Sequence, residues 1–307
     1  MAKPQRTLLE GTVGIPVVEA SDATTRRVGG VTRVLVVGDR DARIAASTYT
    51  PGTGLGDWDV LDLAGLPDWP LDPAKPSQLE GVAADGGSLV ALLREDPPVV
   101  LVADTQSRAL LATISLVAPP WSALAGKWDD PSSRGEGLVL LRGGRLLVAK
   151  EKRPRALIEF GPPGTRPRGL RRDDFLDPDE SWDPPSGEVA YHALALWKLR
   201  GEAKKAIGDI SGISVGPDRS LWLLSDRSAV VARLGLDAGL PRGGGPIRTL
   251  DDVFGLPKGA TKAEGIAVVE PGRALVVLDA PTTTGNGMLL SRPDQTSGGG
   301  GHAAPGE

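Results

Sequence analysis

One sequence pattern recurs four times and constrains the fold more than any other feature. Each copy opens on Glu or Ser followed by Gly and closes on an acidic residue fifteen positions later. The copies run from Glu80 to Glu95, from Glu136 to Glu151, from Ser211 to Asp226 and from Glu264 to Asp279. Between these ends lie an apolar run, a turn signal at the midpoint and a second apolar run, which together predict a β-hairpin.

Further strand-like segments follow the hairpins, so the chain divides into units of about four strands at intervals of ~40–75 residues. This pattern predicts an all-β chain folded as a β-propeller with five blades, or six if residues 162–207 contain a degenerate blade. The unit that opens at Glu264 has too few strands of its own. We expect the strand predicted at residues 7–20 to complete it and close the ring. A β-sandwich is the weaker alternative, because it gives no reason to repeat one hairpin at one register.

Three other regions complete this prediction. The first blade is predicted from strands at Val31–Val37, Ala42–Thr50 and Trp58–Leu63, with Asp39 after the first of them but no Glu-Gly pair. Residues 161–188, rich in Pro, Arg and Asp, are predicted to be an insertion loop leaving from the face opposite the hairpin ends. Residues 1–290 are expected to form one domain, and the Gly-rich residues 291–307 a disordered tail.

The hairpin spacing also predicts where a site would lie. With a two-residue turn at each midpoint, Glu80 would face Glu95 across the strand pair. In the same way, Glu136 would face Glu151, and Glu264 would face Asp279. Like charges directly opposite each other destabilise a strand pair. Their repetition indicates that a bound cation or basic neighbours offset the repulsion. Because the first strands of the blades line the central channel, we expect Glu80, Glu136 and Glu264 to converge at its mouth.

A ring of carboxylates without Cys or His suits a hard cation such as Ca²⁺, which takes six to eight oxygen ligands. Glu80, Glu136 and Glu264 are therefore the predicted metal ligands. The predicted binding residues around them are Glu95, Lys150, Glu151, Lys152, Asp209, Ser211, Asp226 and Asp279. The alternative is structural: these acidic side chains would cap tight loops by accepting backbone N–H bonds, without any metal.

Several of these segments resemble the SdiA-regulated propeller family and, more distantly, the esterase-like phytase propellers. The resemblance is carried by residues 147–154, 209–213, 224–228 and 262–267, and it covers roughly residues 78–280. It implies a calcium-associated propeller of unsettled biochemistry. The chain departs from the pattern in the first blade, which lacks the motif, and at Ser211, which stands where Glu is expected.

Composition excludes several classes of function. A net charge of −4 and a pI near 5.4 argue against a nucleic-acid partner, which needs a basic face. The absence of Cys excludes disulfides and thiolate catalysis. No apolar run approaches the ~20 residues that span a bilayer. We expect a cytoplasmic monomer without a membrane partner that binds a small polar ligand or a protein.

Two functions from different classes remain open. In the first, the propeller is a calcium-associated scaffold for binding or interaction. In the second, it is a metal-dependent hydrolase of an ester, lactone or phosphoester, with Glu151 or Asp226 as general base at the channel mouth. The sequence assigns no nucleophile and no catalytic residue.

Overall fold

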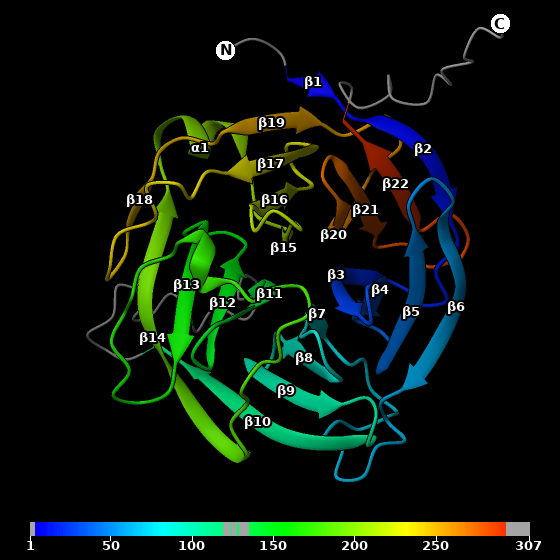
Figure 1. Cartoon of the computed structure of the whole chain (residues 1–307), viewed down its shortest axis with the longest axis vertical. Coiled ribbons are helices and arrows are strands. Elements are labelled where there is room, and N and C mark those ends of the chain that lie inside the picture. The colour runs from blue at the N-terminus through cyan, green and yellow to red at the C-terminus, as the bar shows by residue number, and fades with distance from the viewer. Residues whose placement is uncertain (1–3, 119–123, 125–127, 129–134, 293–307) are drawn as a thin grey trace, which may run out of the picture.

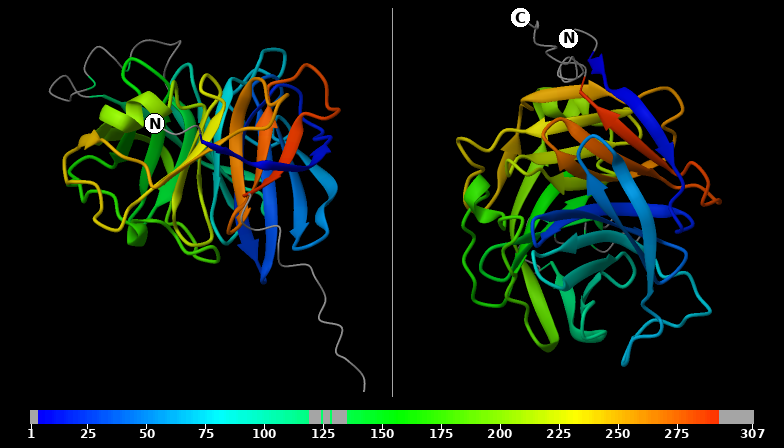
Figure 2. Two further views of the ribbon diagram at one scale, coloured as in Figure 1. Left: turned by 90° about the horizontal axis from the view of Figure 1, so that it is seen from above. Right: turned by 45° about the vertical axis from the view of Figure 1, so that its right-hand side comes forward.

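The structure is a computed structural model that describes residues 4–118, 124, 128 and 135–292. Its described regular structure is almost entirely β, and the sheets stand around one axis as in a β-propeller (Figure 1). Seen from above, the sheets form a disc whose strands run between its two faces (Figure 2). The all-β propeller prediction is confirmed. Most of the predicted glycine-rich tail, residues 293–307, lies outside the described residues.

Five four-stranded antiparallel units can be traced in the described part of the chain, each ordered from the axis outwards. The first contains β3 (Ala20–Val28), β4 (Val31–Gly38), β5 (Arg43–Thr50) and β6 (Gly54–Asp62). The second contains β7 (Leu79–Ala84), β8 (Leu89–Arg94), β9 (Val99–Asp104) and β10 (Ala109–Val117). The third contains β11 (Gly135–Leu141), β12 (Arg145–Lys150), β13 (Ala156–Gly161) and β14 (Gly187–Leu199).

The last two units complete the circle. The fourth contains β15 (Gly212–Val215), β16 (Leu221–Ser225), β17 (Val230–Leu234) and β19 (Asp252–Gly255). The fifth contains β20 (Ala263–Glu270), β21 (Arg273–Leu278), β22 (Gly287–Ser291) and, from the other end of the chain, β2 (Leu8–Val13). The remaining elements are β1 (Gln5–Arg6), a 3₁₀ turn at Arg172–Asp174, α1 (Gly201–Ala206) and β18 (Gly245–Ile247). Among the described residues, no helix is both long and apolar enough to span a membrane.

The N-terminal segment closes the ring, as predicted. Strand β2 pairs antiparallel with β22, with Leu8 opposite Ser291 and Thr12 opposite Met288. Strand β1 adds to the outer edge of the fourth unit by pairing in parallel with β19. The two ends of the chain therefore protect sheet edges that would otherwise be open to pairing with another molecule.

The predicted single strand at residues 7–20 is wrong in its extent. Strand β2 ends at Val13, and a separate strand, β3, begins at Ala20 and forms the innermost strand of the first unit. Its second half, from Thr24 to Arg27, is polar. The apolar periodicity that marks the other inner strands is therefore missing there, which is why the sequence pattern did not reveal this strand.

The inner strands of neighbouring units contact one another around the axis, in the order β3, β7, β11, β15, β20 and back to β3. Glycine makes this closeness possible. A Cβ on Gly265 would lie 2.4 Å from the Cα of Asp22, and one on Gly212 would lie 2.8 Å from the carbonyl oxygen of Glu264. Five clusters of buried apolar residues fill the spaces between adjacent units. The core is thus distributed around the ring.

Strand β14 joins more of the molecule than any other described strand. It pairs antiparallel with β13 and, near its start, in parallel with β10, where Ala112 lies opposite Gly187. Near its end it pairs in parallel with β18. These contacts join the second unit, the third unit and β18 into one sheet of nine strands.

The insertion between β13 and β14 lies at the far ends of the inner strands. The Arg27 amide of β3 donates a hydrogen bond to the carbonyl of Pro178 (3.1 Å), and the Gly86 amide, which follows β7, donates to the carbonyl of Glu180 (2.9 Å). The insertion thus crosses from the third unit to the second and first. It covers the channel end opposite the acidic ends of the hairpins, which is the face that the sequence predicted for it.

Candidate functional site

Each inner glutamate sits in a β-bulge at the start of its strand. The predicted facing of Glu80 and Glu95 is wrong, because Leu79 pairs with Arg94 and Gly81 with Leu93, which leaves Glu80 without a partner in the ladder. The same irregularity occurs at Glu136 and at Glu264. The turns after β7 and β11 are longer than two residues, so the register there shifts from the predicted one. Strands β20 and β21 are joined by the predicted two-residue turn, and a second bulge shifts their register. A bulge re-aims a side chain, and here the three glutamates are directed into the channel mouth.

These side chains line an acidic cavity of about 340 Å³ at the channel mouth, which we call the acidic cup. Ten of its thirteen lining residues are acidic, and they are accompanied by two serines and Lys152. The full set is Glu19, Ser21, Asp39, Glu80, Glu95, Glu136, Glu151, Lys152, Asp209, Ser211, Asp226, Glu264 and Asp279. The structure thus brings every predicted site residue except Lys150 to one cavity.

Lys150 points elsewhere. Its side chain is fully buried, and its Nζ lies 6.0 Å from the centre of the Trp128 ring. Successive residues of a strand face opposite sides of the sheet, so Lys150 enters the sheet-to-sheet core while Glu151 reaches the cup. The prediction that both flanking lysines line the site is therefore wrong for Lys150, whereas Lys152 does line the cup.

The two serines of the inner ring join neighbouring units. Ser21 Oγ donates a hydrogen bond to the carbonyl of Leu79, and Ser211 Oγ donates to the carbonyl of Ala263 at 2.7 Å. In both cases the acceptor residue immediately precedes an inner glutamate of the next unit. These hydroxyls are thus used to position Glu80 and Glu264.

Two acidic residues of the cup cap loops, as the structural alternative proposed. Asp209 accepts a hydrogen bond from Ser225 Oγ (2.5 Å) and one from the Arg227 amide (3.3 Å). Asp226 accepts one from the Ala263 amide (3.0 Å). Without a metal, the Asp209 contacts stabilise loops of the fourth unit, and the Asp226 contact links the fourth unit to the fifth.

Two more acidic side chains are neutralised by lysines at the rim. Lys152 Nζ lies 2.6 Å from Glu151, and Lys262 Nζ lies 2.5 Å from Asp279. The hydrogen bonds from these lysines to the carboxylates raise the pKa of each lysine above its ordinary value. Glu95 also has an interaction partner.

The inner glutamates differ from this outer group. Within the described residues, the carboxylates of Glu80, Glu136 and Glu264 form no hydrogen bond and no ion pair. Burial raises the pKa of Glu80 and of Glu136 well above the ordinary value, and neighbouring carboxylates raise both further. Burial, followed by Asp226 and Asp279, raises the pKa of Glu264 to about 8. The described part of the protein thus supplies no cation to these three carboxyls, and their ionised forms are disfavoured in the cup.

The cup matches a hard cation in chemistry but is not a finished metal site. Its donors are all oxygens, which suits Ca²⁺ or Mg²⁺. In the described part of the chain, however, no three or more His, Cys, Asp or Glu side chains are gathered closely enough to hold a metal ion. Binding would require the glutamates to move closer together than they are in this structure.

Sequence reasoning missed part of the first unit's contribution. Glu19 and Ser21 lie at the start of β3, and Asp39 follows β4 just as Glu95 follows β8. Ser21 occupies the bulge position of the inner glutamates. The β3–β4 hairpin is longer than the other hairpins, so the fifteen-residue spacing is lost there. The one feature of the sequence that could have indicated this contribution was Asp39, which directly follows an apolar strand, as Glu95 does.

Comparisons with known proteins find only distant likenesses. No protein-family model and no curated protein matches the sequence. Among solved structures, glutaminyl cyclase of Myxococcus xanthus is 12% identical, with 94% of this chain and 98% of that chain covered and a TM-score of 0.47. A calcium-binding protein, regucalcin of Agrobacterium tumefaciens, is 12% identical over 94% and 95% of the chains, with a TM-score of 0.48.

A luciferin-regenerating enzyme gives 12% identity over 94% and 95% of the chains, with a TM-score of 0.47. These likenesses are too distant to carry an argument about chemistry. None of the three structures is named as an SdiA-regulated protein, so membership of that family stays a prediction.

Proposed function

We propose that the protein is a cation-dependent binding scaffold that holds Ca²⁺ or a similar hard divalent ion in the acidic cup. One observation carries the proposal: three inner glutamates at equivalent bulges have no protein partner among the described residues. Both serines are hydrogen-bonded, and four outer carboxylates are occupied by hydrogen bonds or ion pairs, namely Glu151, Asp209, Asp226 and Asp279. A divalent cation would supply the positive counter-charge that the described residues do not provide, and Glu80, Glu136 and Glu264 would be its ligands.

The same geometry indicates a weak site with open coordination positions. Three glutamates do not fill the six to eight oxygen positions of Ca²⁺, so water or a ligand oxygen would occupy the rest. Because the carboxylates are not gathered in advance, we expect a Kd of about 10⁻⁴ to 10⁻³ M, at the weak end of protein calcium sites. A polar ligand that completes the coordination would bind more tightly in the presence of the ion.

Calcium titration of matched variants tests this proposal. We expect calorimetric binding of Ca²⁺ to the wild type and a rise of Tm at millimolar Ca²⁺, because a ligand that binds only the folded state stabilises it. Glu136→Gln should lose at least tenfold in affinity. Glu188→Gln, which alters an exposed carboxylate on β14, should bind as the wild type does. Equal affinities for the two variants, or no rise of Tm in the wild type, would refute the proposal.

The hydrolase alternative is supported by one observation. A carboxyl with a pKa near the working pH is suited to general acid–base catalysis, and the pKa of Glu264 is about 8. The two functions are separated by a screen of ester, lactone and phosphoester substrates with and without EDTA. Turnover that EDTA and Glu136→Gln both abolish would favour the enzyme, and calcium-dependent melting without turnover would favour the scaffold.

A further inference from the structure

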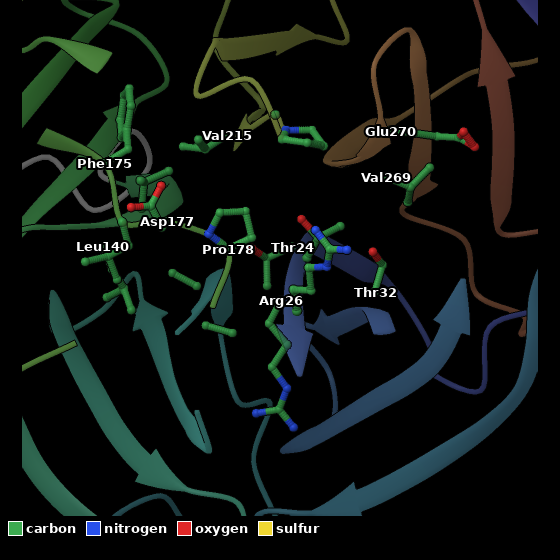
Figure 3. A pocket seen from close by; sticks show the side chains of 18 of the residues that line it. Thr24, Arg26, Thr32, Leu140, Phe175, Asp177, Pro178, Val215, Val269 and Glu270 are labelled. Atoms are coloured by element: carbon green, nitrogen blue, oxygen red, sulfur yellow. The ribbon is translucent and has the colours of Figure 1, made fainter. Parts of the chain in front are cut away.

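A second cavity lies at the opposite ends of the same inner strands. It has a volume of about 270 Å³, and β3, β7, β11, β15 and β20 or the residues directly after them all contribute to its wall. Residues 175–178 of the insertion, Thr32 of β4 and Pro51 after β5 form the rest of the wall. Figure 3 shows Phe175 and Leu140 on one side, Val269 and Glu270 on the other, and Pro178 between them. This axial pocket is distinct from the acidic cup.

The insertion is anchored firmly enough to serve as a wall. Phe175 forms a β-bridge with Leu141, and the Arg142 amide donates a hydrogen bond to the carbonyl of Asp174 (2.8 Å). The Trp182 indole donates to the carbonyl of Leu141 (3.2 Å). Backbone and side-chain contacts thus fix this segment against the third unit on both sides of the pocket residues.

The acidic residues of the axial pocket already have cationic or hydroxyl partners. Asp177 accepts hydrogen bonds from Arg142 Nη2 (2.7 Å) and from Arg219. Glu270 accepts one from the Tyr49 hydroxyl (2.5 Å) and one from Arg273 Nη1 (3.2 Å). Neither carboxylate is therefore available to bind a cationic ligand.

The arginines that border the pocket are directed elsewhere. Arg26 Nη1 donates a hydrogen bond to the carbonyl of Gly87 (3.3 Å), and its side chain runs away from the other labelled residues (Figure 3). Arg27 Nε donates to the carbonyl of Gly30 (3.3 Å) at the exposed end of the hairpin. An anionic ligand would thus find no guanidinium of these two residues pointing into the cavity.

The lining groups of the axial pocket that remain available to a ligand are threonine hydroxyls and apolar side chains. Within the described residues, the hydroxyls of Thr24 and Thr32 form no hydrogen bond, whereas Leu140 and Val269 present side chains that are almost entirely buried. We propose that the axial pocket binds a small uncharged molecule with an apolar body and a hydrogen-bonding group. The apolar body would pack on Leu140, Phe175 and Val269, and the polar group would meet the Thr24 hydroxyl.

Three probes with the same ring and different charge test this inference. Cyclohexanol, cyclohexanecarboxylate and cyclohexylammonium are titrated against the full chain, with ligand-detected NMR as the readout. Cyclohexanol should bind at least about tenfold more tightly than either ion, because a charge buried without a partner is costly. Preferential binding of either ion, equal binding of all three, or no cyclohexanol binding at millimolar concentration would overturn the proposal.

Variants locate the bound probe. Val215→Phe, which fills the pocket, should abolish cyclohexanol binding, and Thr24→Val should weaken it about three- to tenfold through loss of one hydrogen bond. Thr113→Val on β10 is the matched control and should bind as the wild type does. All variants are first checked for a wild-type circular dichroism spectrum. Unchanged binding in both folded pocket variants would overturn the assignment, and Glu136→Gln, which tests the cup, should leave cyclohexanol binding intact.

Discussion

At the scale of single residues, the bulge at the start of an inner strand holds either a glutamate or a serine, and the two side chains act differently there. A serine is short enough to donate its hydroxyl to the carbonyl of the next unit, as Ser21 does from its bulge to Leu79. Glutamate has no hydrogen to donate when ionised, and its longer side chain extends into the channel. Replacing Glu80 by Ser would therefore add a link between units, while replacing Ser21 by Glu would add charge to the cup.

The pKa of Glu264 gives the cation-free protein a specific pH dependence. A carboxyl with a pKa of about 8 in the folded state and an ordinary value near 4.5 in the unfolded state keeps its proton better when folded. The free energy of unfolding should therefore fall as the pH rises from 4.5 towards 8, because folding then requires a buried charge. In Glu264→Gln this fall should be smaller, as urea unfolding at about pH 5, 6, 7 and 8 would measure.

Calcium provides the control for this experiment. If the ion binds the glutamates, millimolar Ca²⁺ should flatten the pH dependence of the wild type and leave that of Glu264→Gln less affected. Parallel curves for the wild type and Glu264→Gln, without calcium, would contradict the assignment of the dependence to Glu264.

Most of the site was accessible from the sequence because equal spacing along equivalent hairpins places residues at equivalent heights. What the spacing could not give is the orientation of individual side chains. Lys150 and Lys152 are both beside Glu151, yet only Lys152 reaches the cup. Side chains alternate between the two faces of the sheet only as far as the end of β12 at Lys150, and the sequence does not show where that end lies. The prediction that Glu80 lies opposite Glu95 was also wrong, because a bulge adds a residue to one strand and the sequence spacing does not reveal it.

At the scale of elements, the glycine that follows each inner glutamate sets how closely the inner strands approach. Gly265→Ala would place a Cβ 2.4 Å from the Cα of Asp22, so one of the two strands would have to shift. Overpacking of this kind costs about 1–3 kcal/mol. We expect a loss of that size in the free energy of unfolding, measured by urea denaturation.

Gly11→Ala is the matched control for this substitution. Gly11 also lies in a strand, at a β2–β22 bulge, but nothing lies within 4 Å of the position that its Cβ would take. Its variant should unfold within about 0.5 kcal/mol of the wild type, as surface substitutions usually do. If both variants lost the same stability, the close approach of β20 and β3 would not be the cause.

The elements that the sequence missed share a physical reason. Strand β3 is half polar because its second half faces the channel end and solvent, so it lacks the alternating apolar pattern of a sheet buried on one side. The short helix α1 has one fully buried residue, Ala203, and gives no amphipathic signal. The hairpins, by contrast, have apolar runs on both sides of a turn and were predicted from residues alone.

At the scale of the whole molecule, the ring depends on a strand contributed from the opposite end of the chain. Deleting residues 1–13 would remove β1 and β2, leaving β22 with an unpaired edge and exposing apolar residues of the fifth unit. We expect Tm to fall by at least about 5 °C, since each kcal/mol of lost stability lowers Tm by about 2–4 °C in a large domain. Differential scanning calorimetry measures this change.

A peptide of residues 1–16 added in excess to the truncated protein provides the control. Because β2 is held by backbone pairing with β22, the peptide should restore part of the lost Tm. A truncated protein that melts at the temperature of the full chain would show that closure by β2 does not stabilise the ring.

The parallel contact between β10 and β14 makes the ring mechanically uneven. Six residue pairs of β10 and β14 form a backbone ladder across the seam from the second unit to the third, whereas β14 and β18 pair over only three residues. Any opening of the disc between these two units must break a ladder of such bonds. Thermal breathing of the molecule should therefore begin at another seam, and the amides of β10 and β14 should be among the last to exchange with deuterium.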